Sequence, residues 1–240
     1  MSARTAFSHV ASFSTGKFID LLFPTVCASC GRIGPVICAG CRAEFQAVQE
    51  PICLRCGRHS PVATTSCPAC AKLGFKITFC RACFNYSEPL VTIIHRLKYE
   101  GLFALATPLG LEMANNWPDW PAMPDLILPV PLHPRRRRAR GFNQSLLLAE
   151  HLGPATAIPV RSDILRRVRH TKPQIGLNPA QRAQNVSGAF ATSPTAVRGR
   201  HILLIDDVFT TGATMLAAAE TLLGAGASRV SAYCLARAVH

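Results

Sequence analysis

A short apolar strand that leads straight into two adjacent acids limits the possible folds most strongly. His201–Ile205 (HILLI) has the composition of a buried strand, Asp206 and Asp207 follow it, and a glycine-containing loop precedes a helix expected over Thr214–Leu223. Buried apolar strands that alternate with helices are typical of a parallel sheet covered on both faces. In such sheets ligands bind at the carboxyl ends of the strands. We therefore expect an open α/β fold with a ligand site at residues 206–214.

The rest of the C-terminal part alternates in the same way. This alternation predicts a doubly wound, mainly parallel sheet. Arg169–Gly188 is polar and basic without an apolar period, so we expect a long loop, and long loops in compact domains usually serve function. Other helices are expected at Leu90–Tyr99, Leu102–Asn115 and Gln144–Leu152, the last ended by Gly153-Pro154, and other strands at Leu126–Leu132, around Ile164 and at Arg229–Leu235.

The residues after the expected strand His201–Ile205 suit a phosphorylated ribose. Adjacent carboxylates accept strong hydrogen bonds from vicinal hydroxyls. The loop offers threonine hydroxyls, a glycine that permits close backbone approach, and a helix amino end whose free N–H groups favour phosphate. An acid pair could instead bind a metal or belong to a nucleoside triphosphatase, but the chain has no GxxxxGK[ST] loop. The candidate ligand-binding residues are Asp206, Asp207, Val208, Thr210, Thr211, Gly212, Ala213 and Thr214.

Three segments carry a resemblance to a known family. LLIDDVFTTGATM (Leu203–Met215) resembles the diphosphosugar signature of type I phosphoribosyltransferases. Together with PVPLHPRRRRARGFNQS (Pro129–Ser145) and RHTKPQIGLNPAQRAQNVSGAF (Arg169–Phe190), it makes the chain similar to the competence protein F (ComF, GntX-like) family from Cys27 onward. This resemblance implies a type I phosphoribosyltransferase fold preceded by a small double zinc ribbon.

The resemblance also implies an activity. Such enzymes bind 5-phosphoribosyl 1-pyrophosphate with Mg²⁺, and an acceptor displaces pyrophosphate at ribose C1. Asp206 and Asp207 would be the catalytic acids that hold the ribose hydroxyls. No residue identifies the acceptor.

Two basic segments receive roles from the same resemblance. The loop at Pro129–Arg138 would contact pyrophosphate, although its arginines could simply form a solvated turn. The segment Arg169–Gly188 would close over the substrate and exclude water, although some of its residues could solvate or cap a loop. Lys98 in the matching segment Arg96–Tyr99 is either a ligand contact or a lysine on a helix surface. The candidates are Pro131, Arg135, Arg136, Arg138, Arg140, Arg169, Lys172, Gln174, Arg182 and Asn185.

Ten of the eleven cysteines form five CxxC pairs between Cys27 and Cys83. This regular spacing indicates metal binding in a reducing compartment rather than the disulfides of a secreted protein, with redox dithiols as the alternative. Four thiolates suffice for one tetrahedral structural zinc, and so short a region needs a bound metal to fold stably. The expected ligands of two zinc ions are Cys27, Cys30, Cys38 and Cys41 in one set and Cys53, Cys56, Cys67 and Cys70 in the other.

Three cysteines, Cys80, Cys83 and Cys234, remain outside the two expected zinc sets. Cys80 and Cys83 are expected to be spare, where the chain enters its second domain, unless they replace another pair. Cys234 lies in an apolar strand and is expected in the core. We therefore divide the chain into a leader at 1–26 with a short amphipathic helix, a double zinc ribbon at 27–83 and a phosphoribosyltransferase domain at 84–240.

The net charge of +13 favours anionic partners. It leaves a second function open, a nucleic-acid-handling accessory of DNA uptake that keeps the phosphoribosyl site for binding. Its partners would be single-stranded or double-stranded DNA and a competence helicase-type protein. No run of about 18 apolar residues predicts a membrane span. The leader lacks a secretory signal and is only weakly similar to a transit peptide, so a cytoplasmic location is expected.

Overall fold

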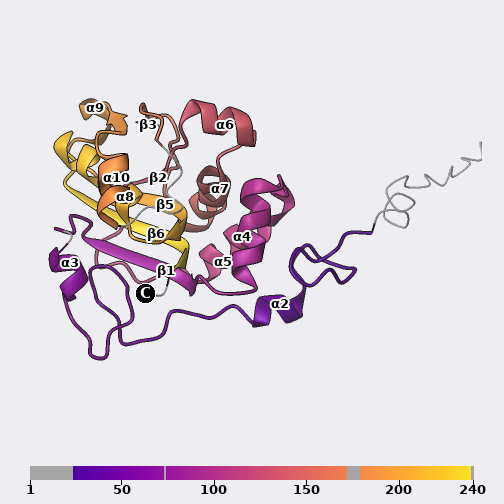
Figure 1. Ribbon diagram of the computed structural model, residues 1–240. Helices are drawn as coiled ribbons and strands as arrows, with labels where there is room; N and C mark the ends of the chain where they lie inside the picture. The colour runs from indigo at the N-terminus through magenta and orange to yellow at the C-terminus, as the bar shows by residue number, and fades with distance from the viewer. Residues whose placement is uncertain (1–23, 73, 172–178, 239–240) are drawn as a thin grey trace, which may run out of the picture.

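Figure 1 shows the computed structural model, which describes residues 24–72, 74–171 and 179–238. Four parallel strands form the central sheet in the order β1-β6-β5-β2. A single parallel bridge from Ile127 to Val160 extends the β2 edge. This is the α/β arrangement expected from the sequence, whereas the expected leader helix falls outside the described residues. The strands span Phe79–Asn85 (β1), Leu126–Pro129 (β2), His201–Phe209 (β5) and Arg229–Arg237 (β6).

Helices cover both faces of this sheet (Figure 1). Successive residues of a strand point to opposite faces, so Leu203 and Ile205 of β5 pack on one side and Ile202 and Leu204 on the other. All four side chains are fully buried. The first side holds α4 (Leu90–Tyr99), the 3₁₀ turn η1 (Phe103–Leu105), α5 (Ala106–Asn115) and α7 (Gln144–Thr156). The second holds α10 (Ala213–Gly224), α8 (Pro179–Val186), α9 (Pro194–Val197) and the antiparallel pair β3 (Leu165–Arg167) and β4 (Phe190–Thr192).

One helix is longer than its sequence predicts. α7 does not end at Gly153-Pro154 but continues to Thr156, and Ala157 then ends it in a left-handed conformation with φ of 57°. Pro154 lacks an N–H group and therefore leaves the carbonyl of Glu150 without its helical hydrogen bond. Glu150 is exposed, so water can hydrate that carbonyl. The proline is tolerated for this reason, and the expected helix end was wrong.

The acid pair lies within a strand rather than after it. β5 continues beyond Ile205 because its pairing with β6 continues, from Asp206 opposite Cys234 to Phe209 opposite Arg237. Cys234 is fully buried there, as expected for a core residue. The two carboxylates are consequently held by a rigid sheet and not by a loop.

Two basic segments expected to be loops contain helices. α6 (Pro134–Arg140) starts with a proline, whose fixed φ suits a first helical turn. His133 Nδ1 accepts a hydrogen bond from the Arg135 N–H at 3.3 Å, and Gly141 ends the helix at φ of 85°. Within Arg169–Gly188, α8 forms and packs against α10. The prediction of a long loop was wrong here, because α8 depends on this tertiary contact, which an apolar period in the sequence does not reveal.

The cysteine-rich segment packs against the sheet domain instead of standing apart. Its helices are short, α2 (Ala39–Ala43) and α3 (Pro68–Lys72). Ala28 and Ile37 pack in the core that contains α4, α5 and α7. Arg42 of α2 forms an ion pair with Glu112 of α5.

β1 already belongs to the sheet although it carries the fifth cysteine pair. It begins at Phe79, and Cys80 and Cys83 are both buried in it. Across the described residues, no helix combines the length and the hydropathy needed to cross a membrane.

Candidate functional site

A cavity of about 790 Å³ opens at the carboxyl ends of β2 and β5. It lies where the sequence predicts the ligand site, because parallel strands end at the same edge of the sheet. α4, α6, α7 and α10 contribute to its walls. The lining residues are Lys98, Tyr99, Gly101, Val130, Pro131, Leu132, Arg136, Ala139, Arg140, Gln144, Arg167, Asp206, Asp207, Val208, Phe209, Thr210, Gly212, Ala213, Thr214 and Met215.

The two acids differ in their surroundings. Asp206 Oδ1 accepts a hydrogen bond from Ser145 Oγ at 2.7 Å and another from the Asp207 N–H at 3.0 Å. Burial, followed by the charge of neighbouring Asp207, raises the pKa of Asp206 to about 7. Asp207 is only 3% exposed, and its Oδ1 lies 2.8 Å from Lys98 Nζ. Asp207 therefore has a cationic partner, whereas Asp206 is a buried carboxyl group without one among the described residues.

Lys98 is part of the site and not a surface lysine. Its side chain is 18% exposed and reaches Asp207 from α4. Burial alone would lower the pKa of Lys98, but the Asp207 carboxylate outweighs that effect and raises it. The ammonium group consequently stays charged next to the Asp207 side chain.

We call the loop between β5 and α10 (residues 210–212), together with the amino end of α10, the cradle; Thr210, Gly212, Ala213 and Thr214 line the cavity. Gly212 caps α10 with φ of +79°, and no side chain hydrogen-bonds to that helix end from the cap. A Cβ atom at this position would collide with the Phe209 ring, so only glycine fits. The helix dipole at this amino end favours an anion.

Unpaired polar atoms show that the site fits a polar ligand. Asp207 Oδ2 and Thr211 Oγ1 are buried and have no hydrogen-bond partner among the described residues. Leaving such atoms unpaired costs about 1–3 kcal/mol each. Asp207 lines the cavity, so its Oδ2 could accept a hydrogen bond from a bound ligand, whereas Thr211 does not line the cavity.

Three arginines face the cavity. Arg136 and Arg140 line it from α6, and Arg140 Nη1 donates to Gln144 Oε1 at 2.6 Å. Arg167, which the sequence analysis missed, lies in β3, is 7% exposed and donates to Thr171 Oγ1 at 2.6 Å. Burial and then the charge of Arg136 lower the pKa of Arg167 to about 10. These three guanidinium groups make the cavity suitable for a polyanion.

Arg167 and Ser145 carry little sequence signal of their own. Arg167 is one of several arginines in a basic run, and only the β3–β4 pairing turns it toward the cavity. Ser145 closes the segment Pro129–Ser145, which was singled out for its arginines. Its place at the start of α7, next to Asp206, could have been suspected only from the fold.

Other predicted candidates lie away from the cavity. Arg135 and Arg138 are exposed on α6 and do not line it, whereas Pro131 does. The Arg169 guanidinium donates to the Asn185 carbonyl at 3.2 Å and to the Ser187 carbonyl, so it ties β3 to the end of α8. Lys172 and Gln174 lie outside the described residues, as does the side chain of Arg182.

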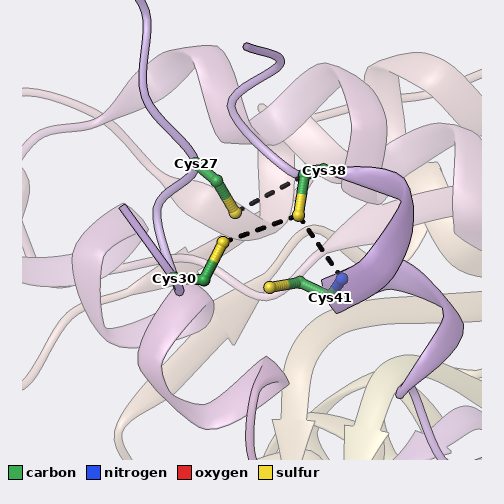
Figure 2. A group of neighbouring side chains, drawn as sticks. All are labelled: Cys27, Cys30, Cys38 and Cys41. Atoms are coloured by element: carbon green, nitrogen blue, oxygen red, sulfur yellow. Dashed lines mark hydrogen bonds between the residues drawn. The ribbon is translucent and has the colours of Figure 1, made fainter. Parts of the chain in front are cut away.

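The eight expected zinc ligands come together in two sets of four. Figure 2 shows the first set, Cys27, Cys30, Cys38 and Cys41, with the four side chains turned toward one another. Cys30 Sγ lies 3.6 Å from Cys38 Sγ, and the Cys38 N–H donates to Cys27 Sγ at 3.4 Å. Within each set the sulfur atoms lie within 4.8 Å of one another, which suits a tetrahedral zinc site.

The second set, Cys53, Cys56, Cys67 and Cys70, is entirely buried. Burial would raise the pKa of Cys53, but the N–H groups of Cys56, Cys67 and Arg55 outweigh it and lower the pKa to about 6. Cys53 is thus held toward the ionised form that binds zinc, whereas burial raises the pKa of Cys56 and of Cys70. Cys80 and Cys83 belong to neither set.

Comparisons with known proteins give the same two parts. Residues 18–71 match the double zinc ribbon domain, and residues 143–240 match the phosphoribosyl transferase domain. The chain is 36% identical to competence protein F of Haemophilus influenzae over 161 residues, which cover 64% of this chain and 70% of the relative. It is 37% identical to DNA utilization protein YhgH of Escherichia coli K12 over 158 residues, covering 64% and 69%. Competence protein ComFC of Bacillus subtilis is 29% identical over 160 residues, covering 65% and 63%.

We expect opposite effects on stability from the two acids. Because the pKa of Asp206 is about 7 in the folded chain, its contribution to stability is full below its ordinary pKa and is lost as pH rises through 7. Asp206→Asn mimics the protonated acid and should stabilise the ligand-free protein at pH 8 by about 1–3 kcal/mol, and by less at pH 5.5. Asp207→Asn removes the charged partner of Lys98 and should lower the stability of the ligand-free protein at pH 8. Urea denaturation in excess zinc measures the free energy of unfolding of both variants. An equal change in the two variants would contradict the different surroundings assigned to Asp206 and Asp207.

The cysteine sets predict two zinc ions per chain. Cys30→Ser and Cys53→Ser should each lose one ion by elemental analysis, because each set has only four ligands. Cys53→Ser should lower the melting temperature of the sheet domain more, since Cys53 is fully buried in its core whereas Cys30 is exposed. Cys83→Ala serves as the control and should keep both ions; loss of one would show that Cys83 is a ligand.

Proposed function

This chain belongs to the competence protein F family, and we propose that it binds phosphoribosyl pyrophosphate with Mg²⁺ and transfers the phosphoribosyl group to an acceptor. One observation carries the proposal: an acid pair, the amino end of α10 and three arginines face a single cavity. A ribose with phosphate at one end and pyrophosphate at the other needs these three kinds of group. The phosphoribosyl transferase domain match supports the same reading.

The acids would hold the ribose. Its vicinal hydroxyls would donate to Asp206 and to Asp207 Oδ2, the buried oxygen without a partner among the described residues. Lys98 would remain on Asp207 Oδ1 and hold the side chain in place. Ser145, which donates to Asp206, would fix the orientation of that side chain. The sheet thereby positions the ribose before reaction, which is the main contribution of such a site to rate.

The loop and helix would hold the 5-phosphate. Thr210 and Thr214 line the cavity, and Gly212 lets the ligand approach the backbone of the loop. Backbone N–H groups at the start of α10 would donate to the phosphate, because the Gly212 cap has no side chain that would compete for them.

Arg136, Arg140 and Arg167 would bind the pyrophosphate. As the acceptor forms its bond to C1, the bond from C1 to the pyrophosphate oxygen breaks and pyrophosphate leaves with the electron pair. Guanidinium groups already in place can stabilise the growing negative charge through bidentate hydrogen bonds. Mg²⁺ would be held by oxygens of the substrate and by water, and it would neutralise part of the same charge.

DNA handling is the second candidate function. Two observations favour it: the net charge of +13, and the names of relatives, which refer to competence and DNA utilization. The charge suits phosphate backbones of single-stranded or double-stranded DNA. A competence helicase-type protein is a further partner suggested by the family. Ligand binding at the acid pair and DNA binding are compatible in one protein.

Calorimetric titration of the zinc-loaded protein with phosphoribosyl pyrophosphate tests the first function. We expect saturable binding that requires Mg²⁺, and its loss in the double variant Asp206→Asn, Asp207→Asn, because the hydroxyls lose their charged acceptors. Asp163→Asn is the matched control, since Asp163 is an exposed acid that pairs with Arg161 and does not line the cavity. Unchanged affinity in the folded double variant would exclude the acid pair as the ribose site.

DNA affinity measured at several salt concentrations tests the second function. Binding through phosphates should weaken steeply, with a logarithmic slope of about −0.9 for each phosphate neutralised on duplex DNA and about −0.7 on single strands. Fluorescence anisotropy of a labelled oligonucleotide gives the slope. Binding that is absent, or that does not change with salt, would count against DNA handling.

A further inference from the structure

Arg237 is a buried cation that has no carboxylate partner among the described residues. It ends β6, is 5% exposed, and donates from Nη1 to the Cys56 carbonyl, while its Nε has no partner among the described residues. None of the ion pairs found in the described part of the chain involves it. Burying an uncompensated charge costs several kcal/mol, so a countercharge must lie close by.

The second cysteine set supplies that countercharge when it holds zinc. Four thiolates around one Zn²⁺ leave a net negative charge, and Cys56, whose carbonyl accepts from Arg237, is one of the four. Four neutral thiols would provide no such charge. The buried guanidinium therefore fits a metal-bound second set better than a reduced, metal-free one.

On its other side Arg237 contacts the end of β5. Its guanidinium carbon lies 4.7 Å from the ring centre of Phe209, which is 3% exposed. Phe75 approaches the same ring at 6.2 Å, and the Phe75 N–H donates to the carbonyl of Cys70, another member of the second set, at 3.1 Å. Two links thus run from the second cysteine set to Phe209.

Phe209 in turn packs against the cradle. Its ring occupies the space that a Cβ atom of Gly212 would need, so the ring and the α10 cap are in close contact. Phe209 also immediately precedes the loop residue Thr210, which lines the cavity. A shift of the ring would move Gly212 and the N–H groups that follow it.

We propose that the second zinc centre positions the phosphate cradle through Arg237 and Phe209. Arg237 is a positioning residue in this scheme, because it does not line the cavity but holds a residue that does. The inference relies on the proposed function for the identity of the ligand. The metal centre thereby does more than stabilise a ribbon: loss of zinc from the second set weakens ligand binding, whereas loss from the first set leaves it nearly unchanged.

Two readouts test this inference on the full-length, zinc-loaded protein. Zinc release to a chromogenic chelator reports the link from Arg237 to the metal, and calorimetry with phosphoribosyl pyrophosphate and Mg²⁺ reports the cradle. Arg237→Met removes the charge but keeps the length of the side chain. It should release one of the two zinc ions on the order of tenfold faster and bind the ligand on the order of tenfold more weakly. Arg237→Lys, which keeps the charge, should partly restore zinc retention.

Phe209→Leu tests the link from Phe209 to the cradle without changing the link from Arg237 to the metal. It also replaces Arg237→Met as the test of the cradle if that variant does not fold. It should retain both zinc ions at the wild-type release rate and still bind the ligand several-fold more weakly. Arg81→Met is the matched control. Arg81 also stacks on an aromatic ring, Phe79 at 3.6 Å, and donates to a ribbon carbonyl, that of Leu54 at 2.9 Å, but it does not contact the cradle. It should leave ligand affinity unchanged.

The outcomes distinguish this inference from the proposed function. If the wild-type protein fails to bind phosphoribosyl pyrophosphate, the proposed function is wrong and the cradle link falls with it, while zinc release still decides the link between Arg237 and the metal. If the wild-type protein binds and either Arg237→Met or Phe209→Leu binds equally well, the cradle link is overturned and the proposed function stands. Equal zinc release in Arg237→Met and wild type overturns the metal link.

Discussion

The site depends on the desolvation of two adjacent carboxylates at the end of the inner strand β5. Both faces of this strand are covered, and its pairing with β6 continues past the acids. Burial raises the pKa of Asp206, and within the described part of the chain the ammonium group of Lys98 is the one ion-pair partner of Asp207. A ligand with vicinal hydroxyls would restore the hydrogen bonds that water no longer supplies. The rest of the cavity, with its helix amino end and arginines, surrounds this unsatisfied centre.

The cysteine-rich segment is integrated with the sheet domain on both of its sides. The first set reaches the α4 and α5 side through Ala28 and Ile37, while the second set lies in the core shared with α10. A small ribbon with few apolar residues gains a packing surface in this way. The domain that it contacts gains a buried negative centre next to Arg237. The second cysteine set and the residues that pack behind the ligand cavity, Phe209 and Met215, consequently belong to one core.

Local patterns in the sequence predicted much of this arrangement. Both cysteine sets, the cradle at Gly212 and the alternation of strands and helices follow from spacing within short segments. The errors concern features that need the tertiary structure: the extension of β5 through Asp206 follows from its pairing with β6, and α8 depends on its contact with α10. Arg167 reaches the cavity only through the β3–β4 pair, and the use of Lys98 depends on the packing of α4 beside β5.

A crystal structure of the zinc-loaded protein with phosphoribosyl pyrophosphate and Mg²⁺ tests the central claim most directly. The account predicts the ribose hydroxyls within hydrogen-bond distance of Asp206 and Asp207. It places the 5-phosphate on the backbone N–H groups that follow Thr210 and the pyrophosphate beside Arg136. Ligand density elsewhere, with the acid pair still bound only to Ser145 and Lys98, would contradict it.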